Sequence, residues 1–366
     1  MNALVKNLLG WKTKRKIIVI ESDDWGSIRM SSNDAIAKLK SLGANIEKSR
    51  YEMYDSLESN SDMETMFETL MKFKDSNGKH PVITGVNVVA NPDFEKIKQS
   101  GYQQYFYEPF TETLKKYPEH DKVYKYWKYG IENRLMVPQF HGREHLNVNR
   151  WMRALQSGSK GELAAFELGV TGLSPAIYKD FKAEYQGAFE LELLSDLESQ
   201  KEVLISGTKL FQELFGYKST AFTPTNGPFS STLEPVLKDC GIELIQTARV
   251  VYKEPIGGGK FKRKLRYMGM KNSLGQRYLV RNCVFEPNEH LGFDWFDFCM
   301  KRIEQALKYN NPVIITTHRV NYTGTLNQDN RDNSLAELEK LLKGIITKWP
   351  DVEFMTTAEL GLLMNK

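Results

Sequence analysis

Residues 16–27, KIIVIESDDWGS, carry the strongest structural signal in the sequence, because a run of Ile and Val ends abruptly in two carboxylates, Asp23 and Asp24. Continuous apolar runs are typical of strands buried on both faces, as in parallel sheets. Acidic side chains are rarely buried without a partner or a task. A solvated turn after the strand is the alternative, since Asp and Gly are also turn formers. The choice between the two depends on polar residues elsewhere in the chain.

Three of the six histidines lie in positions that could join these carboxylates. His141 and His145 are four residues apart in QFHGREHLN, and His318 ends a second apolar run, PVIITTHR. Two histidines with this spacing can point the same way from a helical turn, and with one carboxylate they supply three ligands to a divalent metal. Such a pair alone is common by chance on a helix. Together with Asp23 and Asp24 it becomes specific.

The composition is that of an ordinary globular protein. The 366 residues are 41% hydrophobic and 26% charged, which permits a substantial core. We predict a single domain over residues 1–366, because single α/β barrels commonly reach this size. The formal net charge of +4 is too small to favour nucleic acid as a partner. Three widely spaced cysteines form no disulfide framework and fit a reducing compartment.

The N-terminus, MNALVKNLLGWKTKRK, has a short apolar patch before its basic cluster, the reverse of the order in a signal peptide. No run approaches the roughly 18 apolar residues that span a bilayer. We therefore expect a cytoplasmic protein without a transmembrane segment. A peripheral membrane contact through the N-terminal patch is the alternative.

Apolar runs and helical spacing alternate along the chain. Besides the first run, strands are predicted at residues 81–90, 135–140, 219–225, 242–247, 312–317 and 352–356. Helices are predicted at residues 33–42, 61–74, 146–155, 294–308 and 335–348, with a helical tail at the end of the chain. A long helix is predicted at residues 191–215, with a bend at Ser206 and Gly207, and a further helix that ends at residue 237 follows the strand at 219–225. Insertions are expected around 43–78, 100–132, 160–190 and 250–287. This alternation predicts a parallel α/β sheet or barrel of about seven strands, with reacting groups at the strands' C-terminal ends.

Asp23, Asp24, His141, His145 and His318 all fall at such strand ends. This combination resembles the polysaccharide deacetylases, carbohydrate esterase family four and its relatives, which have a distorted (β/α) barrel and remove acetyl groups from sugar polymers with a bound metal. By that resemblance, Asp23 is the catalytic base, Asp24, His141 and His145 are metal ligands, and His318 is the general acid.

The family's third motif, Arg-x-Pro-Tyr, is present only in part at residues 222–225. By resemblance, Pro224 and Thr225 lie at the substrate, with the Thr225 backbone N–H helping to hold the oxyanion. Phe222 replaces the arginine that usually pairs with the base. Arg143 and Arg319, which flank the other motifs, are the candidates to replace it.

Trp25 follows the two aspartates where the family usually has glycine, and its ring could stack on a sugar or narrow the cleft. The fourth motif, Asp-x-x-Asp-Trp, has no clear match. Glu144 is interpreted as a helix-surface acid. The remaining histidines are interpreted as lying outside the site, His120 in an exposed loop. A basic run is interpreted as part of a solvated hairpin, with an anion site as the alternative: Lys260, Lys262, Arg263, Lys264 and Arg266.

The residues predict a metal-dependent hydrolase, and the family resemblance implies that it removes an acetyl group, N-acetyl before O-acetyl, from a saccharide or saccharide-linked intermediate. The expected cofactor is a divalent metal, zinc first, with cobalt, nickel or manganese as alternatives. The expected partner is a carbohydrate substrate, and the oligomeric state is open. Two other functions fit the same residues: a non-catalytic saccharide-binding protein, and a metal-dependent hydrolase of a non-sugar C–N bond.

Overall fold

The computed structural model describes residues 9–253, 262–290 and 292–365. The first eight residues of the N-terminal patch and Lys260 of the basic run lie outside these ranges. No helix within them is long and apolar enough to cross a membrane.

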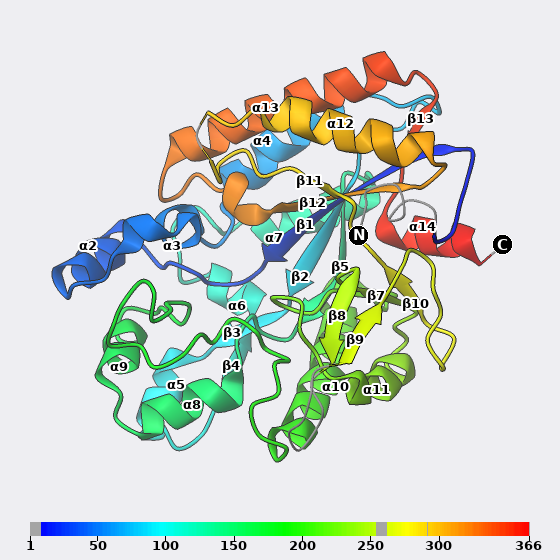
Figure 1. Ribbon diagram of the computed structural model, residues 1–366. Helices are drawn as coiled ribbons and strands as arrows, with labels where there is room; N and C mark the ends of the chain where they lie inside the picture. Colours follow the sequence, from blue (N-terminus) through cyan, green and yellow to red (C-terminus); the bar gives the residue numbers. More distant parts are fainter. Residues whose placement is uncertain (1–8, 254–261, 291, 366) are drawn as a thin grey trace.

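A curled parallel sheet forms the centre of the molecule (Figure 1). Eight strands follow the order β10, β7, β6, β5, β2, β1, β12, β11, and β13 joins at the beginning of β1; every pairing between them is parallel. Their bounds are β1 Lys16–Trp25, β2 Ile83–Val88, β5 Met136–Gly142, β6 Ala221–Phe222, β7 Leu244–Gln246, β10 Arg277–Leu279, β11 Cys283–Val284, β12 Val313–His318 and β13 Val352–Phe354. The expected distorted (β/α) barrel is confirmed, with additional short strands.

Helices surround the sheet, and α4, α12 and α13 lie together along one side of it (Figure 1). The helices are α2 Asn33–Ser41, α3 Arg50–Tyr54, α4 Asn60–Met71, α5 Phe94–Gln99, α6 Phe110–Leu114, α7 Val123–Glu132, α8 Val148–Gln156, α9 Lys160–Phe166, α10 Asp196–Phe215, α11 Glu234–Asp239, α12 Trp295–Lys308, α13 Gln328–Lys348 and α14 Thr357–Met364. Two antiparallel strand pairs are added, β3 Ala90–Pro92 with β4 Tyr107–Pro109 and β8 Val250–Lys253 with β9 Lys262–Leu265.

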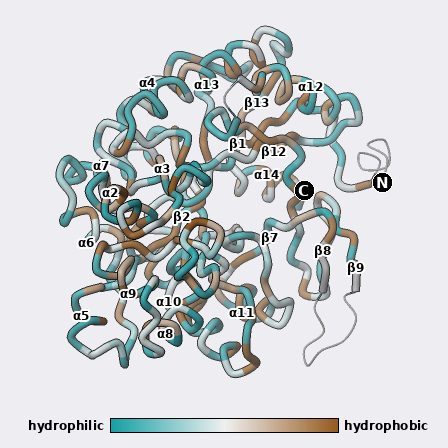
Figure 2. Tube along the Cα trace, turned by 60° about the vertical axis from the view of Figure 1, so that its left-hand side comes forward, coloured by the Kyte–Doolittle hydropathy of each residue, from teal (hydrophilic) through white to brown (hydrophobic). Residues whose placement is uncertain are grey.

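The alternation of side chains along β1 explains its continuous apolar run. Ile18 and Ile20 pack in the large core cluster. Ile17 and Val19 point to the opposite face, where they meet apolar residues of β6, β7, β10 and β12 and of helix α14. Strand residues two apart share a face, so both faces of β1 are buried. Figure 2 shows hydrophobic residues concentrated along β1 and β12.

Some predicted elements differ in their bounds. Helix α13 begins at Gln328 rather than at 335, because Asn327 caps a polar first turn that lacks apolar spacing. The strand predicted at 219–225 is reduced to β6, since the chain turns at Asn226, which has a positive φ of 55°. Helix α10 continues through Gly207, where an added Cβ would lie 2.8 Å from the Phe140 ring. Glycine there permits close approach to β5.

The interpretation of His120 as an exposed loop residue is wrong. Its side chain is buried, and its ring nitrogens lie 2.5 Å from the carbonyl oxygen of Pro118 and 3.1 Å from that of Leu57. His120 therefore joins two loops inside the fold and lies away from the predicted metal ligands.

Candidate active site

Both carboxylates of β1 reach the same cavity although they are adjacent in a strand. Ile17, Val19 and Asp23 are spaced by multiples of two, so Asp23 continues the face that lies inside the curled sheet. Asp24 would point to the opposite face in a regular strand. Its backbone has a φ of 77°, and the register with β2 shifts between Ser22 and Trp25. This β-bulge re-aims Asp24, and both side chains line the same cavity.

The two predicted metal histidines come from the end of β5, which is separated from β1 only by β2. His141 lies in the strand itself, and Gly142 has a φ of 149°, which a residue with a side chain rarely adopts. The chain then bends through His145 before α8 begins at Val148. The expected helical turn is wrong: an extended residue and a bend bring the two rings together, with centroids 5.1 Å apart.

Asp24, His141 and His145 form a compact donor set. The Asp24 Oδ1 atom lies 3.3 Å from His141 Nε2 and 3.1 Å from His145 Nε2, and one ligand atom from each residue lies within 4.8 Å of the other two. His141 Nδ1 lies 2.7 Å from the carbonyl oxygen of Thr223. Because a carbonyl only accepts, Nδ1 carries the hydrogen and the Nε2 lone pair is directed toward Asp24.

Electrostatics agree with a ligand role for this donor set. Burial lowers the pKa of His145, which favours the neutral imidazole that a metal requires. Two imidazole nitrogens and one carboxylate leaving one side open are typical of a catalytic zinc site. The residues present therefore fit a divalent metal.

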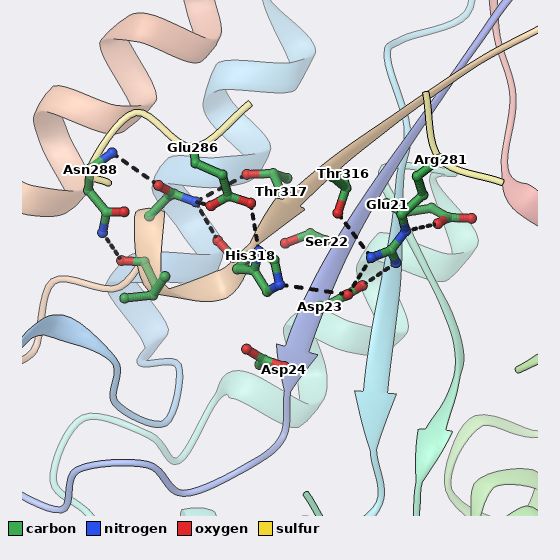
Figure 3. Close-up of polar contacts among 12 residues, drawn as sticks. Glu21, Ser22, Asp23, Asp24, Arg281, Glu286, Asn288, Thr316, Thr317 and His318 are labelled. Carbon is green, nitrogen blue, oxygen red and sulfur yellow. Dashed lines mark hydrogen bonds and ion pairs between the residues drawn. The ribbon is translucent and has the colours of Figure 1, made fainter. Parts of the chain in front are cut away.

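Asp23 is held by an arginine that the motifs did not identify. Arg281, which follows β10, donates from Nη1 to Asp23 Oδ2 at 2.6 Å and from Nη2 to Asp23 Oδ1 at 2.5 Å, and its Nε donates to Glu21 at 2.7 Å (Figure 3). This bidentate geometry is the strongest form of ion pair. Burial would raise the pKa of Asp23, but Arg281 outweighs it and lowers the pKa below the usual value. Asp23 is therefore ionised at neutral pH.

His318 also has a buried partner of opposite charge, but here the predicted reacting group is the cation and its partner, Glu286, is the anion. His318 Nδ1 lies 2.6 Å from Glu286 Oε1, and His318 Nε2 lies 3.9 Å from Asp23 Oδ2 (Figure 3). Glu286 is itself held by Asn321 at 2.8 Å and by Arg50 at 2.8 Å. Burial alone would lower the pKa of His318, but Glu286 and the two aspartates raise it to about 9. The ring is therefore an imidazolium at neutral pH.

Neither arginine proposed as the partner of Asp23 has that position. Arg143 donates to Glu144 at 2.5 Å and lies over the Tyr107 ring, 4.0 Å from its centroid. Arg319 is fully buried and pairs with Asp55 and Glu58. Both side chains are satisfied by acids nearer to them in space. Glu144, expected on a helix surface, is also buried, because the chain here is a bend and not a helix.

The remaining predicted substrate residues divide into two groups. Trp25 is completely buried, donates to Ser22 Oγ at 2.9 Å and packs edge-on against Trp127. It lies in the core and not in the cavity, so its predicted contact with a sugar is wrong. Pro224 lines the cavity. The Thr225 side chain is buried and accepts from the Ala188 backbone N–H at 2.9 Å, so only its backbone N–H stays a prediction.

A cavity of about 590 Å³ opens at the C-terminal ends of the strands and contains all five motif residues in its lining: Asp23, Asp24, His141, His145 and His318. Arg281 lines it as well. The residues missed from sequence, Arg281 and Glu286, each follow a very short strand, β10 and β11. The strand-end rule could have found them, but those strands lie in a segment whose turns and charges indicated an insertion.

Comparison with known proteins does not assign the chain to a family. No family model matches the sequence, and no curated protein matches it. Solved structures of similar fold include one assigned as a polysaccharide deacetylase from Mycobacterium smegmatis, at 10% identity and a TM-score of 0.46, covering 98% of this chain and 93% of the other.

An allantoinase is similar to the same degree, with 10% identity, a TM-score of 0.46 and coverage of 96% of this chain and 91% of the other. A 4-α-glucanotransferase from Thermococcus litoralis also has 10% identity and a TM-score of 0.46, covering 95% of this chain but 40% of the other. These likenesses assign no activity. The functional argument rests on the side chains of this chain.

Proposed function

We propose that this protein is a metal-dependent hydrolase that removes an acetyl group, N-acetyl before O-acetyl, from a saccharide. One observation carries the proposal: a single cavity brings together a three-residue metal-ligand set, a carboxylate paired with arginine and an imidazolium paired with glutamate. Metal-assisted amide hydrolysis uses these three elements, a Lewis acid, a base and an acid.

Asp24, His141 and His145 would hold the metal, with zinc expected first because two imidazole nitrogens and a carboxylate suit it. Cobalt, nickel and manganese accept similar ligands. When bound, a divalent metal polarises the acyl oxygen and lowers the pKa of water.

Asp23 and His318 divide the proton transfers. Asp23, kept ionised by Arg281, takes a proton from the attacking water. His318, kept protonated by Glu286, gives a proton to the leaving nitrogen. The 3.9 Å between His318 Nε2 and Asp23 Oδ2 supports the action of this acid and this base on one reacting centre. The backbone N–H of Thr225 is proposed to stabilise the developing oxyanion.

The alternative of a non-catalytic saccharide-binding protein drew its support from two gaps, the missing arginine beside the base and the unplaced fourth motif. Arg281 and Glu286 supply the corresponding charges from other positions in the chain. The hydrolase is therefore the better supported function. Hydrolysis of a non-sugar C–N bond uses the same groups and is separated from deacetylation by the substrate tested.

Elemental analysis of purified protein tests the metal site first. We expect one divalent metal per chain in the wild type, its loss in His141→Ala, and its retention in the control His290→Ala, which changes an exposed histidine outside the cavity. Absence of metal from the wild type, even after reconstitution with zinc, would contradict the proposal.

Acetate release from N,N′-diacetylchitobiose and longer chitin oligomers tests the reaction. Asp23→Asn is expected to keep the metal and to lower kcat about 10²- to 10⁴-fold, the usual contribution of a general base. Turnover of a cyclic amide such as hydantoin, with no acetate from any saccharide, would establish the non-sugar alternative. Full activity in Asp23→Asn would remove Asp23 as the base.

A further inference from the structure

Three polar side chains outside the motifs line the candidate active-site cavity: Glu52 of α3, Gln186 of the loop before α10, and Gln246 at the end of β7. Their exposed fractions are 2%, 7% and 6%. Among the described residues, Glu52 Oε2, Gln186 Nε2 and Gln246 Oε1 have no hydrogen-bond partner. A buried polar atom without a partner is costly. Three such side chains around one cavity therefore point to a ligand toward which their polar groups can rotate to make the missing bonds.

The backbone that carries Gln186 is held by Asn147 on both sides. Gln186 lies between Tyr185, whose carbonyl accepts from Asn147 N at 2.6 Å, and Gly187, whose carbonyl accepts from Asn147 Nδ2 at 3.2 Å. Asn147 is two residues beyond the metal histidine His145. The loop that carries Gln186 is thus anchored to the motif that binds the metal.

Glu52 is oriented by an arginine on its other oxygen. Arg29 donates to Glu52 Oε1 from Nη2 at 2.6 Å and from Nε at 3.2 Å, which leaves Oε2 as the unpaired acceptor. An added Cβ on Gly172 would lie 2.9 Å from Arg29 Nε and 2.9 Å from Gln186 Nε2. Arg29 and Gln186 therefore pack side by side against Gly172, and Glu52, Arg29 and Gln186 form one wall of the cavity.

Gln246 stands on another segment of the lining. It is the last residue of β7 and pairs in register with Leu279 of β10, so its side chain lies at the C-terminal edge of the sheet, where ligands of α/β folds bind. Its unpaired atom is an acceptor, as is that of Glu52, whereas the unpaired atom of Gln186 is a donor.

We propose that Glu52, Gln186 and Gln246 are specificity-determining residues that bind the ring hydroxyls of a small saccharide of one or two rings. Sugar hydroxyls both donate and accept, which matches two acceptors and one donor spread over different walls. The cavity of about 590 Å³ is in the range that encloses a small ligand. This inference rests on the proposed function and names the substrate class of the same site.

Calorimetric titration of the zinc-loaded, full-length Asp23→Asn protein with N,N′-diacetylchitobiose tests the inference without turnover. Gln186→Leu and Gln246→Leu, each added to that protein, are expected to weaken binding about tenfold, the value of one hydrogen bond to a ligand. Gln200→Leu is the matched control: Gln200 Oε1 is also buried and unpaired, but Gln200 does not line the cavity. Affinities within twofold of the parent in both variants would overturn the inference.

A second measurement uses neither Gln186→Leu nor Gln246→Leu, so it does not depend on whether these variants fold. N-acetylglucosamine should bind the zinc-loaded Asp23→Asn protein at least about 100-fold more tightly than acetamide, because acetamide offers no ring hydroxyls to the three residues. Equal affinities would refute the inference even if acetate release from saccharides is observed. Conversely, the protein could take up no metal and still bind a saccharide that Gln186→Leu and Gln246→Leu release more easily. That result would support the inference and refute the hydrolase.

Discussion

The two halves of the candidate active site are built in different ways. The metal-ligand half, Asp24 with His141 and His145, comes from two short motifs at the ends of β1 and β5. The acid and base half pairs Asp23 with Arg281 and His318 with Glu286, so each reacting group depends on a partner more than 30 positions away in the sequence. Both halves meet in one cavity.

This difference reflects what each half requires. A metal ligand must present one particular atom within a few tenths of an ångström, so its residue type and its place at a strand end are constrained. A partner that tunes a pKa has only to deliver an opposite charge, and any long side chain can do so from several directions. Arg281 therefore replaces a motif arginine from a different strand end, with β10 in place of β6.

The largest expected effect comes from breaking the base half alone. Arg281→Met leaves Asp23 and Glu21 buried without their cation, which should destabilise the protein by about 3–5 kcal/mol. The pKa of Asp23 should rise, since Arg281 is what lowers it. The acid limb of the pH–rate profile should then move to higher pH, because the base must be ionised. Chemical denaturation and kcat/KM against pH measure the two effects.

Metal content separates the two halves in that variant. Arg281→Met should still bind one zinc, because in the part of the chain that the structure describes Arg281 forms hydrogen bonds and ion pairs with Asp23, Glu21 and Thr316 and none with Asp24, His141 or His145. Arg281→Lys, which keeps the charge without the bidentate geometry, is the matched control. Its stability and the pH of its acid limb should lie between those of the wild type and of Arg281→Met. Loss of zinc in Arg281→Met would mean that the halves are not independent.

A smaller effect is expected from Glu286→Gln, which breaks the acid half. Glu286 is the main attraction that offsets burial and raises the pKa of His318 to about 9. A raised histidine pKa stabilises the fold below the unfolded value near 6.5, and this contribution is lost as the pH rises through about 9. Without Glu286 the pKa of His318 should fall, and the basic limb of kcat/KM should move from about pH 9 toward lower pH.

An NMR titration of the His318 ring protons checks this assignment directly, and Glu289→Gln, which changes an exposed acid three residues away, is the control. A basic limb that does not move in Glu286→Gln, with a normally folded protein, would show that Glu286 does not set the protonation of His318.

The sequence was sufficient for the fold and for the grouping of Asp24, His141 and His145, because both depend on local patterns. The alternation of apolar runs with helical spacing predicted the parallel sheet, and the strand ends predicted that Asp24, His141 and His145 meet, whereas their roles as ligands were implied by the family resemblance. The helical turn assumed for His141 and His145 was wrong, since the pair depends on the positive φ of Gly142 and the bend after it. Spacing alone does not reveal which backbone brings two rings together.

The acid and base half could not be predicted because burial and pairing are properties of the assembled core. Arg319 and Arg143 were nearer to the motifs in sequence than Arg281, but each is taken up by another carboxylate, Asp55 or Glu144. Strands of two or three residues, such as β10 and β11, also carry too little periodicity to be recognised. Their strand ends were therefore overlooked.

The smallest expected effect comes from Trp25, which is next to the aspartates of both halves in sequence. Trp25 follows Asp24 in sequence, yet its ring packs on Trp127 in the core and its indole N–H donates to Ser22. Trp25→Phe should lower the free energy of unfolding by about 1–3 kcal/mol, from the lost hydrogen bond and the smaller ring, and should leave the KM for diacetylchitobiose within twofold. A large rise in KM with unchanged stability would instead place the ring in the cavity. The bulge turns the Asp24 carboxylate toward His141 and His145, while the Trp25 side chain goes into the core. We therefore expect Trp25→Phe to change stability and not KM.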